Sequence, residues 1–87
     1  MDPLMGEIKL FPYDFAPHGW LACQGQLLSI QQYAPLFTLV GTQFGGDGSS
    51  TFGLPDLRTH NPLAGPDTVA VGYCIATEGA YPNRPQP

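Results

Sequence analysis

Serine, histidine and aspartate side chains all occur in this chain, so a hydrolytic site is the first chemistry to consider. A serine nucleophile works with a histidine base and often sits in a Gly-x-Ser-x-Gly turn. The sequence contains no such turn, and its two histidines, His18 and His60, lie in loop-like segments without an evident partner. Its aspartates are scattered and do not form a carboxylate pair. We therefore expect no catalytic residues and no enzyme activity.

A glycine-rich segment at 44–50, with the letters FGGDGSS, is the second candidate, because such loops can hold a phosphate or a cation. Phosphate-binding loops end in Lys-Ser or Lys-Thr and open a long helix, whereas calcium loops carry alternating aspartates and a final glutamate. Neither pattern is present. The segment therefore predicts a structural turn, with no cofactor and no metal ion.

Asp56 and Arg58 stand two residues apart, directly after Pro55. A carboxylate and a guanidinium at this spacing can form charge-assisted hydrogen bonds. Two interpretations stay open: a clamp at an interface with another subunit, or a lock on the local turn.

Cys23 and Cys74 each lie in an apolar stretch that predicts a buried strand position. A disulfide between them would stabilise a small domain, but synthesis in the cytoplasm argues against it. Whether they are joined stays open. Two cysteines are too few for a structural zinc site, which uses four ligands.

The charge balance disfavours one class of partner. Three basic residues stand against seven acidic ones, and the net charge of −4 cannot neutralise a phosphate backbone. We therefore expect no nucleic-acid binding. Only 11% of the residues are charged, which indicates either a surface partly covered by a partner or a surface of uncharged polar residues.

The sequence also predicts a protein that is made in the cytoplasm and is not inserted in a membrane. Its first residues lack the basic and apolar regions of a secretory signal. No apolar run approaches the roughly 20 residues that span a bilayer.

Short strands separated by loops are the main structural prediction. Glycine and proline make up 21 of the 87 residues, which suits one small domain rich in turns. Apolar patterns predict strands at 7–11, 20–23, 27–30, 51–54 and 68–76. The last stretch is apolar on both faces, so we expect it at the centre of a sheet. The second and third stretches flank a three-residue connection that contains Gly25, which predicts a hairpin.

One helix is expected within residues 31–40, where apolar residues recur at helical spacing. Pro35 is compatible only with the first turn, so the helix should begin near Ala34 or Pro35 and end before Gly41, buried along one side. Residues 81–87 show no periodicity and predict a tail that is flexible or bound to a partner. The fold class is therefore α+β: a small single domain over 1–87 of short strands and a hairpin, with one short helix and long ordered loops.

Four motifs resemble, in their order and spacing, the phage tail collar domain family of short tail fibre proteins and microcystin-dependent proteins. They are PHGWLACQGQLL at 17–28, LFTLVGT at 36–42, FGGDG at 44–48 and TFGLPDLR at 51–58. The opening residues 6–12 and the stretch 72–84 are also similar to that family, so the resemblance covers residues 6–84.

This resemblance implies a structural component of a phage tail fibre, baseplate or phage-tail-like particle. Such a component is synthesised in the bacterial cytoplasm without a signal peptide, assembles as a homotrimer and docks to other tail fibre or baseplate proteins in the virion tail or tail-like particle. By analogy, Trp20, Phe37 and Phe52 would belong to the core. The residues expected at subunit or partner contacts are Phe44, Gly45, Gly46, Asp47, Gly48, Asp56, Arg58 and His60.

An alternative function is a receptor- or glycan-binding adhesion module at the host cell surface. Aromatic side chains can stack on sugar rings, and each candidate could equally serve in packing. The candidates for glycan contact are Tyr13, Phe15, Tyr33 and Tyr81.

The chain departs from the family after the LPDLR motif at 54–58. Family members usually continue there through a long stretch rich in glycine, serine and threonine, whereas only residues 59–67 fill that position here. The chain thus resembles a shortened collar that lacks the receptor-binding tip, which puts host-receptor and metal binding in doubt.

Overall fold

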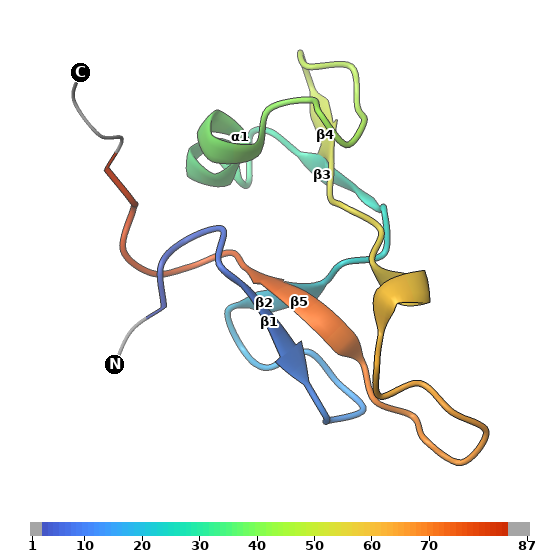
Figure 1. Cartoon of the computed structure of the whole chain (residues 1–87). Coiled ribbons are helices and arrows are strands. Elements are labelled where there is room, and N and C mark those ends of the chain that lie inside the picture. Colours follow the sequence, from blue (N-terminus) through green and yellow to red (C-terminus); the bar gives the residue numbers. More distant parts are fainter. Residues whose placement is uncertain (1–2, 84–87) are drawn as a thin grey trace.

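Two small antiparallel sheets and one short helix form the fold (Figure 1). This computed structural model describes residues 3–83. Its elements are, in order, β1 (Ile8–Phe11), β2 (Trp20–Ala22), β3 (Leu27–Ser29), α1 (Ala34–Val40), β4 (Thr51–Gly53), the 3-10 turn η1 (Arg58–His60) and β5 (Gly72–Ala76). The predicted small α+β architecture is confirmed.

The first sheet has the strand order β1-β5-β2, so β5 is central as predicted. Its partners run antiparallel on both sides, with Ile75 opposite Ile8 in β1 and Leu21 in β2. The predicted start of this strand at residue 68 is wrong, because β5 begins only at Gly72. Residues 68–71 make other bonds: the Val71 N–H, for example, donates to the Tyr13 carbonyl at 2.6 Å.

The second sheet pairs β3 with β4, and this pairing overturns the predicted hairpin. The strands at 20–22 and 27–29 both form, but they belong to different sheets and do not pair with each other. The Gln26 side chain takes the place of a hairpin partner, because its Nε2 donates to the Ala22 carbonyl at 2.7 Å and its Oε1 accepts the Gln24 N–H at 3.0 Å.

The connection between the two sheets is itself paired with another part of the chain. The Leu54 N–H donates to the Gln26 carbonyl at 3.0 Å, and the Leu57 N–H donates to the Cys23 carbonyl at 2.9 Å. Between them lies an antiparallel bridge of Gln24 with Asp56. The LPDLR motif at 54–58 thus continues the β3–β4 pairing toward the first sheet.

The helix α1 occupies the predicted residues. Pro35 lies in its first turn, and the Gly41 N–H donates to the Phe37 carbonyl at 2.7 Å where the helix ends. The expectation of one fully buried side is too strong, since only Leu36 is buried and Phe37 and Val40 are half-buried. A two-turn helix between a small sheet and solvent cannot cover a whole apolar face.

The core is small and joins both sheets to the helix. Its cluster of buried residues consists of Cys23, Leu36, Phe52, Leu54 and Ile75. Phe52 is fully buried and Phe37 packs against the cluster, at 5.5 Å between ring centroids, so both are core residues as predicted. Trp20 is not, because it is only half-buried and lies outside the cluster.

Both cysteines are buried, as the sequence predicts, and they are free thiols in this structure. Cys23 follows β2, and its N–H donates to the Tyr73 carbonyl of β5 at 3.0 Å. Burial, and to a lesser degree the neighbouring Cys74 thiol, raises the pKa of Cys23 to about 11. Burial also raises the pKa of Cys74. Both thiols are therefore held in the protonated, unreactive form.

The two ends of the described chain lie together. Leu4 forms a parallel bridge with Ala80, and the Ala80 N–H donates to the Pro3 carbonyl at 3.1 Å. The predicted tail at 81–87 lies partly outside the described residues. Its first residue, Tyr81, is tied to α1 by a 2.6 Å hydrogen bond between its hydroxyl and that of Thr38.

Candidate functional site

The glycine loop, residues 44–48, lies along the free edge of β4. The Gly53 N–H donates to the Gly45 carbonyl at 2.9 Å, and the Gly48 N–H donates to the Thr51 carbonyl at 3.0 Å. At Gly46 the loop backbone approaches β4 so closely that a Cβ atom would overlap Phe52 Cα and stand 2.6 Å from the Thr51 carbonyl oxygen. A glycine is therefore required at Gly46.

Asp47 fixes this loop with its own carboxylate. Its Oδ1 accepts the N–H groups of Ser49, Ser50 and Thr51 at 2.9, 2.8 and 3.0 Å. Its Oδ2 accepts the Ser50 hydroxyl at 3.0 Å. These bonds, above all those from the backbone, hold the pKa of Asp47 well below its ordinary value of 3.8. Four donors from the residues directly after the loop, Ser49 to Thr51, occupy the carboxylate, which is the arrangement of a structural turn.

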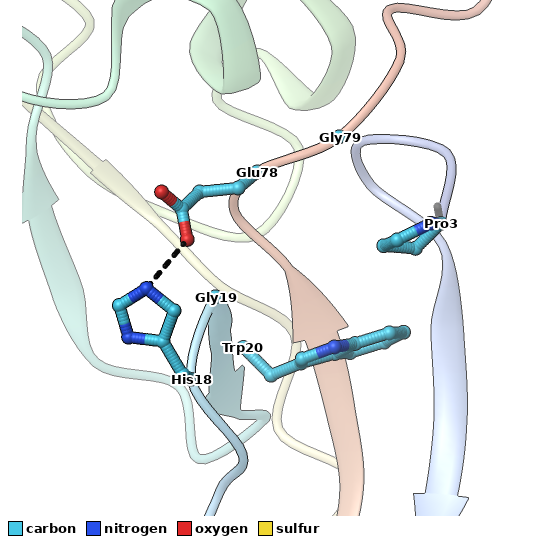
Figure 2. Close-up of a pocket in the computed structure, with 6 residues that line it drawn as sticks. All are labelled: Pro3, His18, Gly19, Trp20, Glu78 and Gly79. Carbon is cyan, nitrogen blue, oxygen red and sulfur yellow. Dashed lines mark ion pairs between the residues drawn. The ribbon is translucent and has the colours of Figure 1, made fainter. Parts of the chain in front are cut away.

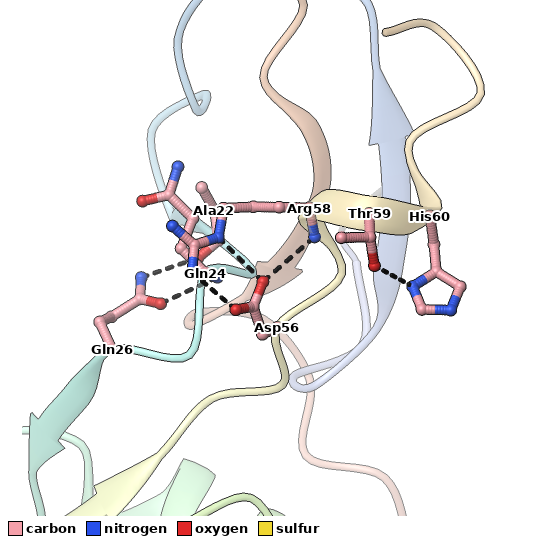
Figure 3. A network of polar contacts seen from close by, with 7 residues as sticks. All are labelled: Ala22, Gln24, Gln26, Asp56, Arg58, Thr59 and His60. Carbon is pink, nitrogen blue, oxygen red and sulfur yellow. Dashed lines mark hydrogen bonds and ion pairs between the residues drawn. The ribbon is translucent and has the colours of Figure 1, made fainter.

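Asp56 and Arg58 form a bidentate ion pair on the surface (Figure 3). Arg58 Nε and Nη2 donate to Asp56 Oδ1 and Oδ2 at 2.9 and 2.7 Å, and the Arg58 N–H donates to Oδ1 at 3.2 Å. The Arg58 side chain lowers the pKa of Asp56 to about 2. The pair therefore locks its own turn, and its exposed guanidinium is held in one orientation.

The predicted contact residues lie in two segments. The glycine loop runs beside β4, with Gly45 bonded to Gly53 at the end of the strand, and the Asp56–Arg58 pair and His60 follow β4 farther along the chain, as Figure 1 shows. His60 ends η1, where its Nδ1 lies 3.3 Å from the Thr59 hydroxyl, in view in Figure 3. Phe44 is the large apolar side chain at the loop end and is 46% exposed.

Two of the predicted glycan-contact residues belong to a continuous aromatic strip, which we define as Phe11, Tyr13 and Phe15. Tyr13 stacks on Phe11 and on Phe15, with centroid distances of 5.7 and 5.6 Å and interplanar angles of 24° and 20°. Tyr13 is 48% exposed and Phe15 is 61% exposed. The loop after β1 thus carries stacked rings from the sheet into solvent.

The other two predicted glycan-contact residues lie elsewhere. Tyr33 packs against the core beside α1, and the Tyr81 hydroxyl is bonded to Thr38. Tyr13 presents little free ring face to a sugar, since it stacks on two neighbours. Phe15, at the end of the strip, stacks on one neighbour and is the more exposed of the two.

Sequence reasoning missed a cavity that Trp20 lines. The cavity has a volume of about 330 Å³ and is also lined by Pro3, His18, Gly19, Glu78 and Gly79. Figure 2 shows these residues around the space above the indole. Phe11 meets the indole edge-on at 5.0 Å and holds it in place. The wall is assembled from residues near both ends of the described chain, so no local pattern around Trp20 could have indicated it.

The described residues hold no group of three or more His, Cys, Asp and Glu side chains that could bind a metal ion. Likewise, no helix among them is long and apolar enough to cross a bilayer.

Comparison with known proteins identifies one family. No curated protein and no solved structure matches the chain. The sequence model of the phage tail collar domain matches residues 6–62, which is more than half of the chain and includes the glycine loop and the LPDLR motif. That domain is a structural part of phage tail fibres. The chain therefore belongs to the phage tail collar domain family.

Proposed function

We propose that this chain is an assembly module of a phage tail fibre or baseplate, which forms homotrimers in the virion tail and docks neighbouring tail proteins. The observation that carries this proposal is the aromatic strip, an exposed run of stacked rings on a domain with a small core. Contiguous apolar surface of this kind marks interaction sites on soluble proteins.

The energetic scale supports an assembly role. A fully buried large apolar side chain contributes about 1.5–3 kcal/mol. Tyr13 is 48% exposed and Phe15 is 61% exposed, so much of that contribution is unrealised in the single chain. A domain of this size has a total stability of about 5–10 kcal/mol. Burying the strip against a neighbouring subunit would therefore stabilise the folded domain by a substantial fraction of its total stability.

The predicted contact residues supply a second surface for docking. The glycine loop and the Asp56–Arg58 pair are each held rigid by their own hydrogen bonds. A rigid loop loses little conformational freedom when it binds, which favours affinity. We propose that Phe44 and the Arg58 guanidinium meet partner subunits, with His60 beside Arg58.

Host attachment through a glycan is less well supported by the geometry. Four aromatic residues were candidates, and two of them, Tyr33 and Tyr81, have other contacts. The alternative keeps one clear test: saccharide binding by the purified chain that is lost when Phe15 or Tyr13 is replaced.

Sedimentation velocity of surface variants tests the assembly proposal. Phe15→Ser removes the exposed end of the strip, and Val69→Ser is a matched control, because Val69 is 78% exposed in a different loop. We expect Phe15→Ser to shift the chain toward smaller species at the same protein concentration, with unchanged circular dichroism. Val69→Ser should sediment like the unmodified chain. Equal sedimentation of all three proteins as large species would contradict a role for the strip.

A further inference from the structure

Close approaches at two glycines shape the walls of the Trp20 cavity. A Cβ atom at Gly19 would stand 2.8 Å from Glu78 Oε2, and one at Gly79 would overlap the Pro3 carbonyl. The Thr77 N–H donates to the Gly19 carbonyl at 2.8 Å, which ties two of the walls together. The backbone therefore fixes the walls at Gly19 and Gly79, and the exposed side chains of His18 and Glu78 close the remaining side.

Its chemistry combines an aromatic face with a carboxylate. Figure 2 shows the indole of Trp20 on one side of the space and Glu78 on the other, with the Glu78 carboxylate turned toward the His18 ring. Glu78 Oε2 has the His18 ring as its ion-pair partner, with Nε2 at 3.5 Å. The His18 side chain is 99% exposed, so an incoming group can displace it at little cost.

A cation satisfies both groups at once. A positive charge over an indole is attracted by the ring quadrupole, and tryptophan is the best of the aromatic side chains for this contact. The same charge pairs with a carboxylate, and a guanidinium can do both because it is planar and carries several donors. Among residues 3–83, no lysine or arginine lines the cavity. The chain carries a net charge of −4, so the electrostatic field favours a basic ligand.

The size of the cavity limits the ligand. A volume of about 330 Å³ lies at the lower end of the range for small-molecule sites, which is about 300–1,000 Å³. It suits a single long side chain better than an extended ligand.

We propose that the Trp20 cavity binds an arginine side chain presented by a partner protein, with its guanidinium between the Trp20 ring and the Glu78 carboxylate. That the partner is a neighbouring tail protein rests on the assembly role proposed above, whereas the ability of the cavity to bind a guanidinium does not. His18 gives up its contact with Glu78 when the arginine enters.

The test uses the fluorescence of Trp20, which is the one tryptophan of the chain. The full chain is titrated with N-acetyl-arginine amide and, separately, with the uncharged isostere N-acetyl-citrulline amide. We expect a saturable change in emission with the arginine compound and binding at least tenfold weaker with citrulline. Glu78→Gln should weaken arginine binding at least tenfold, whereas Asp67→Asn, the same charge change in an exposed loop, should not.

Three results would overturn the proposal. They are an equal response to arginine and citrulline, unchanged arginine binding in Glu78→Gln, and a saturable response only to monosaccharides such as glucose or N-acetylglucosamine. Light scattering on the same samples separates this proposal from the assembly role. A monomer that binds the arginine compound would support the cavity and count against assembly, and a trimer that does not bind it would overturn the cavity alone.

Discussion

At the scale of single residues, Asp47 shows how the hydrogen bonds of one side chain can fix a loop that has little apolar packing of its own. One carboxylate accepts three backbone N–H groups and a hydroxyl, and so fixes the glycine loop. The sequence predicted a structural turn here without saying what closes it. An aspartate in a glycine-rich segment often bonds to the backbone two or three residues on, so this signal was available.

Stability at acid pH should depend on Asp47. Its pKa is lowered in the folded chain relative to the ordinary value of 3.8, so its contribution is present above that value and is lost as the pH falls through the folded pKa. We expect Asp47→Asn to lower Tm at about pH 6, and the difference from the unmodified chain to narrow toward about pH 3. Asp67→Asn is the control. A constant Tm difference across this range, measured by circular dichroism, would contradict the assignment.

Gly46 should tolerate no side chain. Gly41 is the control, because it has a positive φ like Gly46 but no neighbouring atom close to the position of a Cβ. Both have a positive φ, 91° and 65°, but a Cβ at Gly41 would meet nothing within 4 Å. Alanine at a positive φ costs about 1 kcal/mol, and the overlap at Gly46 adds a further cost of about 1–3 kcal/mol. Urea unfolding of Gly46→Ala and Gly41→Ala should show this difference. Equal losses would mean that β4 can move away from the loop.

At the scale of elements, the sequence predicted the type of each segment, helix or strand, better than it predicted which strands pair with each other. The helix is at its predicted residues because Pro35 and Gly41 act locally as start and stop signals. The central position of β5 followed from its apolar residues on both faces. The hairpin was wrong because a short connection with a glycine permits a hairpin without requiring one. Which strand accepts β2 is decided by distant residues, here β5.

Gln26 should stabilise the connection between β2 and β3, which links the two sheets in place of the predicted hairpin. Its side chain donates to the Ala22 carbonyl and accepts the Gln24 N–H. Gln26→Ala should lower the free energy of unfolding by about 1–2 kcal/mol. Gln26→Glu keeps the acceptor but places an oxygen against the Ala22 carbonyl, so it should cost at least as much. Unfolding in urea gives both values, and a Glu variant as stable as the unmodified chain would rule out this role.

At the scale of the whole molecule, both cysteines are buried: Cys23 belongs to the core cluster that joins the two sheets, and Cys74 lies in the central strand β5. Cys23 and Cys74 are buried as free thiols, and the pKa of Cys23 is raised to about 11. We therefore expect no reaction with a thiol reagent in the folded chain at about pH 8 and two reactive thiols after unfolding. Absence of thiols in the unfolded chain would show that a disulfide joins them.

The whole molecule also explains why Trp20 was misassigned. The family resemblance implied a core position for this residue. The structure instead brings residues near both ends of the described chain, Pro3 and Glu78, beside the indole and leaves a cavity there. Such closure depends on long-range pairing, including the Leu4–Ala80 bridge, which local patterns do not encode.

The central claim is that this small domain is completed by assembly, and the solution mass of the purified chain tests it most directly. Light scattering should be measured over a wide range of protein concentrations, extending to the lowest that gives a reliable signal. The account predicts a mass three times that of the 9.3 kDa chain, constant across the range. A mass of 9.3 kDa at every concentration would contradict it.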